Sequence, residues 1–167
     1  DLLTGETVQR FEGQKSRVLS IGFSPDGSRL LICSGDTLES GFAIQNMVRL
    51  WDVDSGDVLG SFGSGSQPNC AVFLPGAKQF LVGSSAGVIT LHDTADVANP
   101  VKMLVGKTGK GLFEAGVATP HAHSRGVRDL LPMPDGRLVS FAGDSRYPEF
   151  EMRVWTADYE EQHMVVL

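Results

Sequence analysis

Three residues in the last third of the chain have side chains of the types that make up a nucleophilic triad. They are His123, Ser140 and Asp144. In a serine hydrolase, a histidine takes the proton of the serine hydroxyl while a carboxylate orients the imidazole ring. The same three residue types therefore raise the hypothesis of a hydrolase. This hypothesis requires that the elements that carry the three residues bring their side chains together.

Two further motifs could bind a metal or a phosphate. His121 and His123 lie on one face if their segment is a strand, but no cysteine or carboxylate lies close enough in sequence to complete a metal site. The stretch Gly106–Gly111 is rich in glycine and lysine. Its spacing is not that of a phosphate-binding loop, since Leu104 stands where the first glycine belongs and Gly111 follows Lys110. We predict neither a metal nor a cofactor.

The composition excludes several classes. The net charge is −6, which argues against nucleic-acid binding by the chain as a whole. No apolar run reaches the roughly 20 residues of a membrane helix, and no secretory signal is visible, so we expect a cytoplasmic protein, with the nucleus or a cytoskeletal assembly as alternatives. The chain has 20 glycines and few segments of helical period, which predicts an all-β fold.

One phrase of sequence recurs along the chain. Met47–Gly56 alternates apolar and polar residues and ends in a turn, as a β-strand with two faces does. It returns in altered form at Val88–Val97 and Met152–Glu160, and its second half matches Asp1–Phe11. The residue after the tryptophan position falls at 52, 93 and 156, so the units lie 41 and 63 residues apart. A unit near 41 residues is the period of a propeller blade, and the longer unit carries insertions.

These residues carry a resemblance to a known family. Leu50-Trp51-Asp52, Val154-Trp155 and the turns Pro25-Asp26-Gly27 and Pro134-Asp135-Gly136, together with Thr4-Gly5-Glu6 and Ser55-Gly56-Asp57, resemble the signatures of WD-repeat β-propellers. The resemblance implies blades of four antiparallel strands. It divides the chain into a leading strand at 1–16, blades at 17–62, 63–105 and 123–167, and an insertion at 106–122.

The leading strand is expected at Thr7–Phe11. Three blades and one strand are too few to close a propeller, which has about four to eight blades. We therefore expect the chain to be part of a larger propeller, with the remaining blades supplied by a longer polypeptide or by another chain.

The resemblance gives the triad-like residues another role. In WD repeats a histidine, a serine or threonine, an aspartate and the tryptophan form a buried hydrogen-bond chain. Here these are His123, Ser140, Asp144 and Trp155, and in the first blade Ser34, Asp36 and Trp51 remain, with Gln14 in place of the histidine. His92 stands at the tryptophan position of the second blade. We favour this structural role over catalysis.

The insertions predict where the protein binds. Segments 35–46, 106–123 and 143–151 connect strands at one rim of the sheets, and long loops on one face of a rigid scaffold commonly form binding surfaces. We predict a non-catalytic scaffold that binds other proteins, within a multisubunit complex. The candidate partner-binding residues are Lys107, Lys110, Phe113, Arg125, Arg146 and Tyr147.

Two alternatives remain. Segment 102–128 holds five basic residues and one acid, so it could bind RNA or an acidic surface. A propeller enzyme would instead need carboxylates or histidines that converge on the central channel.

Overall fold

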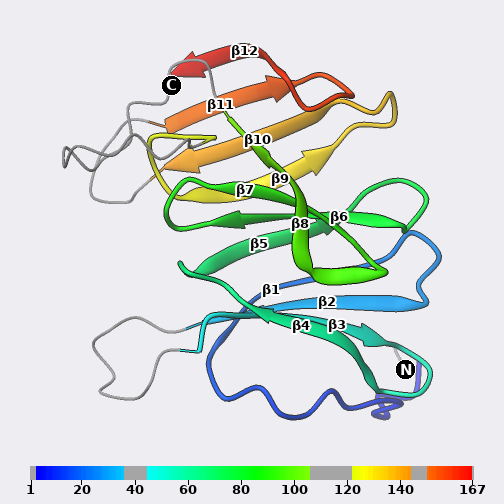
Figure 1. The fold of residues 1–167 in the computed structure, drawn as a ribbon. Coiled ribbons are helices and arrows are strands. Elements are labelled where there is room, and N and C mark those ends of the chain that lie inside the picture. Colours follow the sequence, from blue (N-terminus) through cyan, green and yellow to red (C-terminus); the bar gives the residue numbers. More distant parts are fainter. Residues whose placement is uncertain (1–2, 36–44, 106–121, 144–149, 167) are drawn as a thin grey trace.

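Twelve β-strands in three antiparallel sheets make up the described part of the chain, which contains no helix (Figure 1). The structure is a computed structural model that describes residues 3–35, 45–105, 122–143 and 150–166. Blade 1 consists of β1 (Val18–Phe23), β2 (Arg29–Ser34), β3 (Met47–Asp52) and β4 (Val58–Gly63). Blade 2 consists of β5 (Pro68–Phe73), β6 (Gln79–Ser84), β7 (Ile89–Asp93) and β8 (Asp96–Leu104). Blade 3 consists of β9 (Val127–Pro132), β10 (Leu138–Gly143), β11 (Phe150–Trp155) and β12 (Glu161–Val166).

Each blade is a meander in which every strand pairs with its neighbour in sequence. The turn between β1 and β2 shows why the chain reverses there. Asp26 Oδ1 accepts hydrogen bonds from the backbone N–H of Ser28, at 3.1 Å, and from the hydroxyl of Ser24, at 2.6 Å. Gly27 has a φ of +73°, a conformation that glycine adopts without steric cost. The turn residues therefore fix the register of the two strands.

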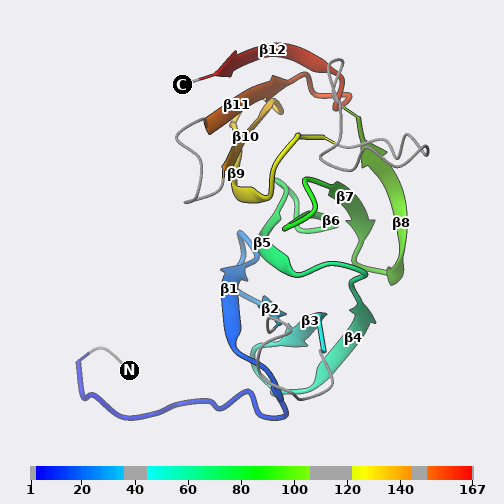
Figure 2. The same cartoon turned by 90° about the vertical axis from the view of Figure 1, so that its left-hand side faces the viewer.

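The blades stack face to face, with their first strands along one edge (Figure 2). β1 contacts β5, and β5 contacts β9, while the later strands of each blade spread outward from this edge. Apolar residues fill both interfaces. The core between blades 1 and 2 contains Leu31, Cys33, Val48, Leu50, Ala71, Phe73, Phe80 and Val82. The core that joins blades 2 and 3 includes Cys70, Leu81, Ile89, Leu91, Leu104, Val127, Leu138 and Trp155. The predicted all-β architecture of propeller blades is thus confirmed.

The two ends of the sheets differ in their connections. We call one end the turn rim, since it carries the links from first to second and from third to fourth strands. The other end, the insertion rim, carries the links from second to third strands and from one blade to the next. The ends of β2, β8 and β10, which precede the segments 36–44, 106–121 and 144–149, all lie at the insertion rim. Figure 1 shows the ends of β2 and β10 on the same side of the molecule.

The strand predicted at Thr7–Phe11 is not formed. Residues 5–15 have no regular secondary structure and run along the outer side of blade 1. A strand requires a neighbour to complete its hydrogen-bond ladder, and none of the described strands pairs with this segment. It is held instead by a side chain, because the ring of Phe11 meets Trp51 edge to face at 5.6 Å between centroids.

Cys33 and Cys70 are both buried and free. Burial raises the pKa of both thiols, that of Cys70 to about 12. No segment within the described ranges forms a helix that could cross a bilayer.

Candidate functional site

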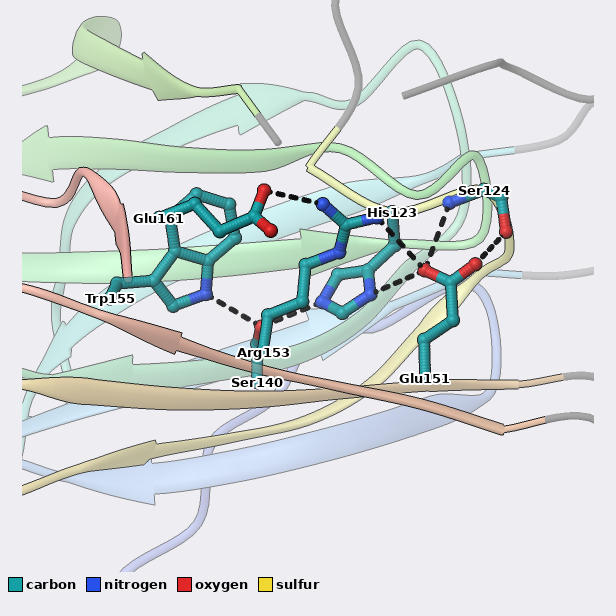
Figure 3. A network of polar contacts seen from close by, with 7 residues as sticks. All are labelled: His123, Ser124, Ser140, Glu151, Arg153, Trp155 and Glu161. Atoms are coloured by element: carbon teal, nitrogen blue, oxygen red, sulfur yellow. Dashed lines mark hydrogen bonds and ion pairs between the residues drawn. The ribbon is translucent and has the colours of Figure 1, made fainter. Parts of the chain in front are cut away.

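Three of the residues singled out in the sequence meet inside blade 3, where Ser140 lies between a tryptophan and a histidine (Figure 3). The indole N–H of Trp155 donates a hydrogen bond to Ser140 Oγ over 2.8 Å. The same oxygen lies 2.6 Å from His123 Nε2. The serine oxygen accepts from the indole N–H, and its own hydrogen remains available for an acceptor. All three residues have an exposed fraction of 0%.

The carboxylate of this chain of contacts belongs to Glu151. Its Oε2 lies 3.0 Å from His123 Nδ1 and 3.3 Å from the backbone nitrogen of Ser124, while the Ser124 hydroxyl donates to Oε1. Because an ionised carboxylate can only accept, Nδ1 carries the proton of the neutral ring and donates a hydrogen bond to Glu151, so Nε2 accepts a hydrogen bond from the Ser140 hydroxyl. Asp144, to which the resemblance assigns the acidic role, lies outside the described residues.

A buried arginine extends the network to a second acid. Arg153 Nη1 lies 2.7 Å from Glu161 Oε2, and its Nη2 lies 3.4 Å from Glu151 Oε2. Arg153 is 1% exposed and Glu161 is 6% exposed. Burying ions is costly unless they are paired and hydrogen-bonded, so the two acids and the arginine hold one another in the interior.

The pKa directions agree with this arrangement. Burial lowers the pKa of His123 and outweighs the opposing hydrogen bond to Glu151, so the imidazole is neutral. Burial by itself would raise the pKa of Glu151, but the hydrogen bonds from His123 and Ser124 dominate and lower it to about 2. The network thus combines a neutral imidazole with an ionised carboxylate at neutral pH.

Two local features of the chain place these side chains. Residues alternate between the faces of β11, so Glu151, Arg153 and Trp155 share one face. On the other side, the backbone N–H of His123 donates to Gly87 O in the β6–β7 turn at 2.9 Å. Gly87 has a φ of +79°, and a Cβ there would lie 2.3 Å from His123 O. A glycine in blade 2 therefore permits the close approach that positions the histidine of blade 3.

The order serine, histidine, carboxylate is that of a hydrolase triad, but the surroundings oppose catalysis. A substrate would have to reach Ser140 Oγ, and that residue is fully buried with its oxygen already bonded to Trp155 and His123. The two ring nitrogens of His123 are likewise engaged, which leaves neither for a metal. In this arrangement the buried polar groups form hydrogen bonds with one another, which stabilises the blade.

Blade 1 lacks this network because an isoleucine stands where blade 3 has Ser140. Leu138 pairs with Trp155 and Ser140 with Arg153, whereas Leu30 pairs with Trp51 and Ile32 with Arg49. Ile32 therefore occupies the position of Ser140, and Ser34 lies two residues further along β2.

The polar groups of blade 1 have different partners as a result. Arg49 Nη1 lies 2.6 Å from Gln14 Oε1 and 3.4 Å from Ser34 Oγ. The indole nitrogen of Trp51 is buried and has no hydrogen-bond partner in the described part of the chain. Asp36 lies outside the described residues.

Blade 2 has a smaller polar arrangement around the histidine at its tryptophan position. His92 Nδ1 lies 2.9 Å from Val97 O and its Nε2 lies 2.8 Å from Thr90 Oγ1. Burial lowers the pKa of His92, so the ring is neutral and Nδ1 donates to the carbonyl. The imidazole stacks between Phe62 of blade 1 and Phe80, with centroid distances of 4.4 and 5.2 Å.

Most candidate partner-binding residues lie outside the described ranges: Lys107, Lys110, Phe113, Arg146 and Tyr147. Arg125 is described and is half-buried next to the network. Among the other basic residues of segment 102–128, Lys102 pairs with Glu160 at 3.2 Å and Arg128 Nε donates to Gly143 O at 2.8 Å. These two cations are engaged within the chain, and they do not form a free basic patch.

Glu151, Arg153 and Glu161 were not singled out in the sequence. The signal was the spacing Glu-x-Arg-x-Trp, which places a charged residue on the same strand face as a core tryptophan. Such an arginine requires an acid beside it.

The fold and the buried network define a stack of β-propeller blades. Residues 5–52 match the family model described as WD domain, G-beta repeat, which confirms the WD-repeat resemblance on that segment. Among solved structures, the chain is similar to Kuenenia stuttgartiensis hydrazine synthase with a TM-score of 0.66 and 17% identity, over 90% of this chain. The matched region spans 37% of that chain. At this identity the similarity shows the fold alone.

Replacing Ser140 by alanine is expected to lower the free energy of unfolding by about 1–3 kcal/mol. The change leaves the Trp155 N–H and His123 Nε2 without their common partner in the interior. Urea unfolding followed by tryptophan fluorescence measures the loss. Ser85→Ala is the matched control, since Ser85 is exposed and its loss should stay within about 0.5 kcal/mol. Covalent labelling of Ser140 by a fluorophosphonate probe would contradict the structural role.

Proposed function

We propose that the chain is a non-catalytic scaffold whose insertion rim binds another protein. The observation that carries the proposal is the placement of the insertions: the strand ends that flank 36–44, 106–121 and 144–149 all belong to one rim. The opposite rim carries short turns, such as the one closed by the hydrogen bond from Gly136 N to Met133 O at 3.0 Å. A rigid stack of sheets with its long segments on one rim suits recognition of a partner.

The network of blade 3 supports this function in a second way. One residue separates His123 from segment 106–121, and one residue separates Glu151 from segment 144–149. Hydrogen bonds between these residues therefore tie together the bases of two insertions. In this proposal the buried polar groups hold the binding rim in place and carry out no reaction.

The partners in this proposal include further propeller blades, from the same longer polypeptide or from another chain in a multisubunit complex. The open side of blade 1 supports it. Trp51 Nε1 and Gln14 Nε2 are buried donors without partners in the described ranges. A further blade against this side would supply acceptors for both.

Charge reversal on the rim tests the scaffold proposal. In the double variant Lys107→Glu and Lys110→Glu, partner recovery by affinity capture is expected to fall at least about tenfold, because two rim cations become acids. Lys78→Glu is the matched control, since this exposed lysine lies in the β5–β6 turn on the turn rim and should leave recovery unchanged. Equal recovery with the double variant and the parent chain would count against binding through segment 106–121.

A further inference from the structure

A cavity of about 430 Å³ lies between blades 1 and 2 at the insertion rim. It opens between the end of β4 with the following residues Gly63–Ser66 and the face of blade 2 formed by β6, β7 and β8. A second hollow beside it shares Gly63–Gly65 as a wall. Small residues line much of the opening, including Gly63, Gly65, Ala86 and Ala98, so the facing strands leave space that larger side chains would fill. The volume falls within the range of small-ligand pockets, roughly 300–1,000 Å³.

One wall of the cavity is aromatic and fixed. Phe62 and His92 both line it, and their rings are stacked at 4.4 Å with an interplanar angle of 20°. His92 cannot turn without losing its hydrogen bonds to Val97 O and Thr90 Oγ1. The wall therefore presents a pre-ordered edge of stacked rings, against which another aromatic ring packs favourably.

The polar groups that line the cavity can form hydrogen bonds with a hydroxyl group of a ligand. Ser84 lines it and is 5% exposed, and its Oγ has no hydrogen-bond partner in the described part of the chain. Thr90 also lines the cavity on the same face of the sheet. Because His92 Nδ1 donates to Val97 O, the Thr90 hydroxyl gives its hydrogen to His92 Nε2 and keeps a lone pair free to accept. A buried hydroxyl without a partner is unusual in a folded protein and gains free energy when a ligand supplies one.

The residues that line the cavity also limit the charge that a ligand can carry. Among the described residues, no aspartate, glutamate, lysine or arginine lines this cavity or the hollow beside it, in a chain of which 20% is charged. A phosphate, carboxylate or ammonium group would lose its hydration there without gaining a counter-ion. The occupant must therefore be neutral.

We propose that this cavity binds a neutral aromatic side chain that carries a hydroxyl, namely a tyrosine of the partner protein. The phenol ring packs beside Phe62 and His92, and its hydroxyl bonds to Ser84. The inference rests on the proposed function, since it supplies an anchor point for a partner docked on the insertion rim. Tyrosine is among the residues that most often anchor protein interfaces.

Titration of the full chain with p-cresol, the side-chain analogue of tyrosine, tests the proposal by NMR. p-Cresol is expected to shift the backbone amide signals of Ser64, Ser84 and Thr90 in a saturable way. Toluene lacks the hydroxyl and should bind about tenfold more weakly, the effect of losing one hydrogen bond of about 1.4 kcal/mol. Benzoate should cause no saturable shift, because it is charged.

Three variants distinguish specific binding at this site from non-specific binding in an apolar crevice. Ser84→Ala should weaken p-cresol binding about tenfold, while the matched Ser85→Ala, an exposed neighbour, should leave it unchanged. Ala98→Leu, an exposed position that lines the cavity, should abolish binding without disturbing the core. Absence of saturable shifts, equal binding of toluene, or unchanged binding by Ser84→Ala would each overturn the proposal. The titration contains no partner protein, so its failure leaves the scaffold proposal to the capture experiment.

Discussion

Replacing Arg153 by methionine is expected to lower the free energy of unfolding by about 3–5 kcal/mol. Methionine fills most of the space of the arginine stem but leaves two acids without their counter-ion. Glu161 is 6% exposed and Glu151 is also largely buried, so neither carboxylate can regain full hydration. Urea or thermal unfolding of the folded chain measures the loss.

An exposed ion pair on the same blade provides the control for this change. Arg137 Nη2 lies 2.8 Å from Asp135 Oδ2, with about half of each side chain exposed. Arg137→Met should therefore cost only about 0–1 kcal/mol. Combining Arg153→Met with Glu161→Gln should restore part of the loss, since it removes one of the uncompensated charges. Equal losses for Arg153→Met and Arg137→Met would show that the buried pair has no special weight.

Truncating Trp155 to alanine is expected to cost about 3–5 kcal/mol. The side chain is fully buried in the core between blades 2 and 3, where it packs with Leu81 and Leu138. Its removal opens a cavity between two blades and also deprives Ser140 of a donor. Denaturant unfolding monitored by circular dichroism measures the change without depending on tryptophan emission.

The two tryptophans allow the hydrogen bond to be separated from packing. Trp155→Phe removes an indole N–H that is bonded to Ser140, whereas Trp51→Phe removes one that has no partner in the described ranges. Both changes reduce the ring by similar volume. Trp155→Phe should therefore be the more destabilising by about 1 kcal/mol, the net worth of a buried hydrogen bond. Equal losses would mean that the bond to Ser140 contributes nothing to stability.

The repeat in the sequence was sufficient to predict the blades. The alternation of Met47–Asp52 and the turn after Pro25 depend on local rules of strand period and turn geometry, so their recurrence marked the strands of each sheet. The same rules failed at Thr7–Phe11, where the pattern of a strand is present without a neighbour to pair with it. A strand is a property of two segments, and one segment alone cannot establish it.

The network was harder to predict because it depends on register. In both blades the residue two positions after the partner of the tryptophan pairs with an arginine, and this pairing makes Ile32 the equivalent of Ser140. Reading the polar residue near the end of β2 as the equivalent of Ser140 therefore selected Ser34. Glu151 was missed for a related reason: it follows an insertion, where spacing from a motif carries no information. The interblade cavity depends on packing between two repeats, which the pattern of one repeat does not specify.

The pairing of every strand with its neighbour in sequence has a kinetic consequence. Within the described ranges no sheet contains a strand from another blade, so each sheet can close as soon as its own four segments have left the ribosome. Most of these hairpins close short loops, and even the longer links before β3 and β11 join neighbouring segments of the chain, which keeps the entropic barrier to each step low. Blade 1 is then available as a template while blade 2 is still being synthesised, and burial of Leu31 and Leu50 waits for the arrival of Phe73 and Phe80. Synthesis from the first blade onward would thus set the order in which the interblade cores assemble.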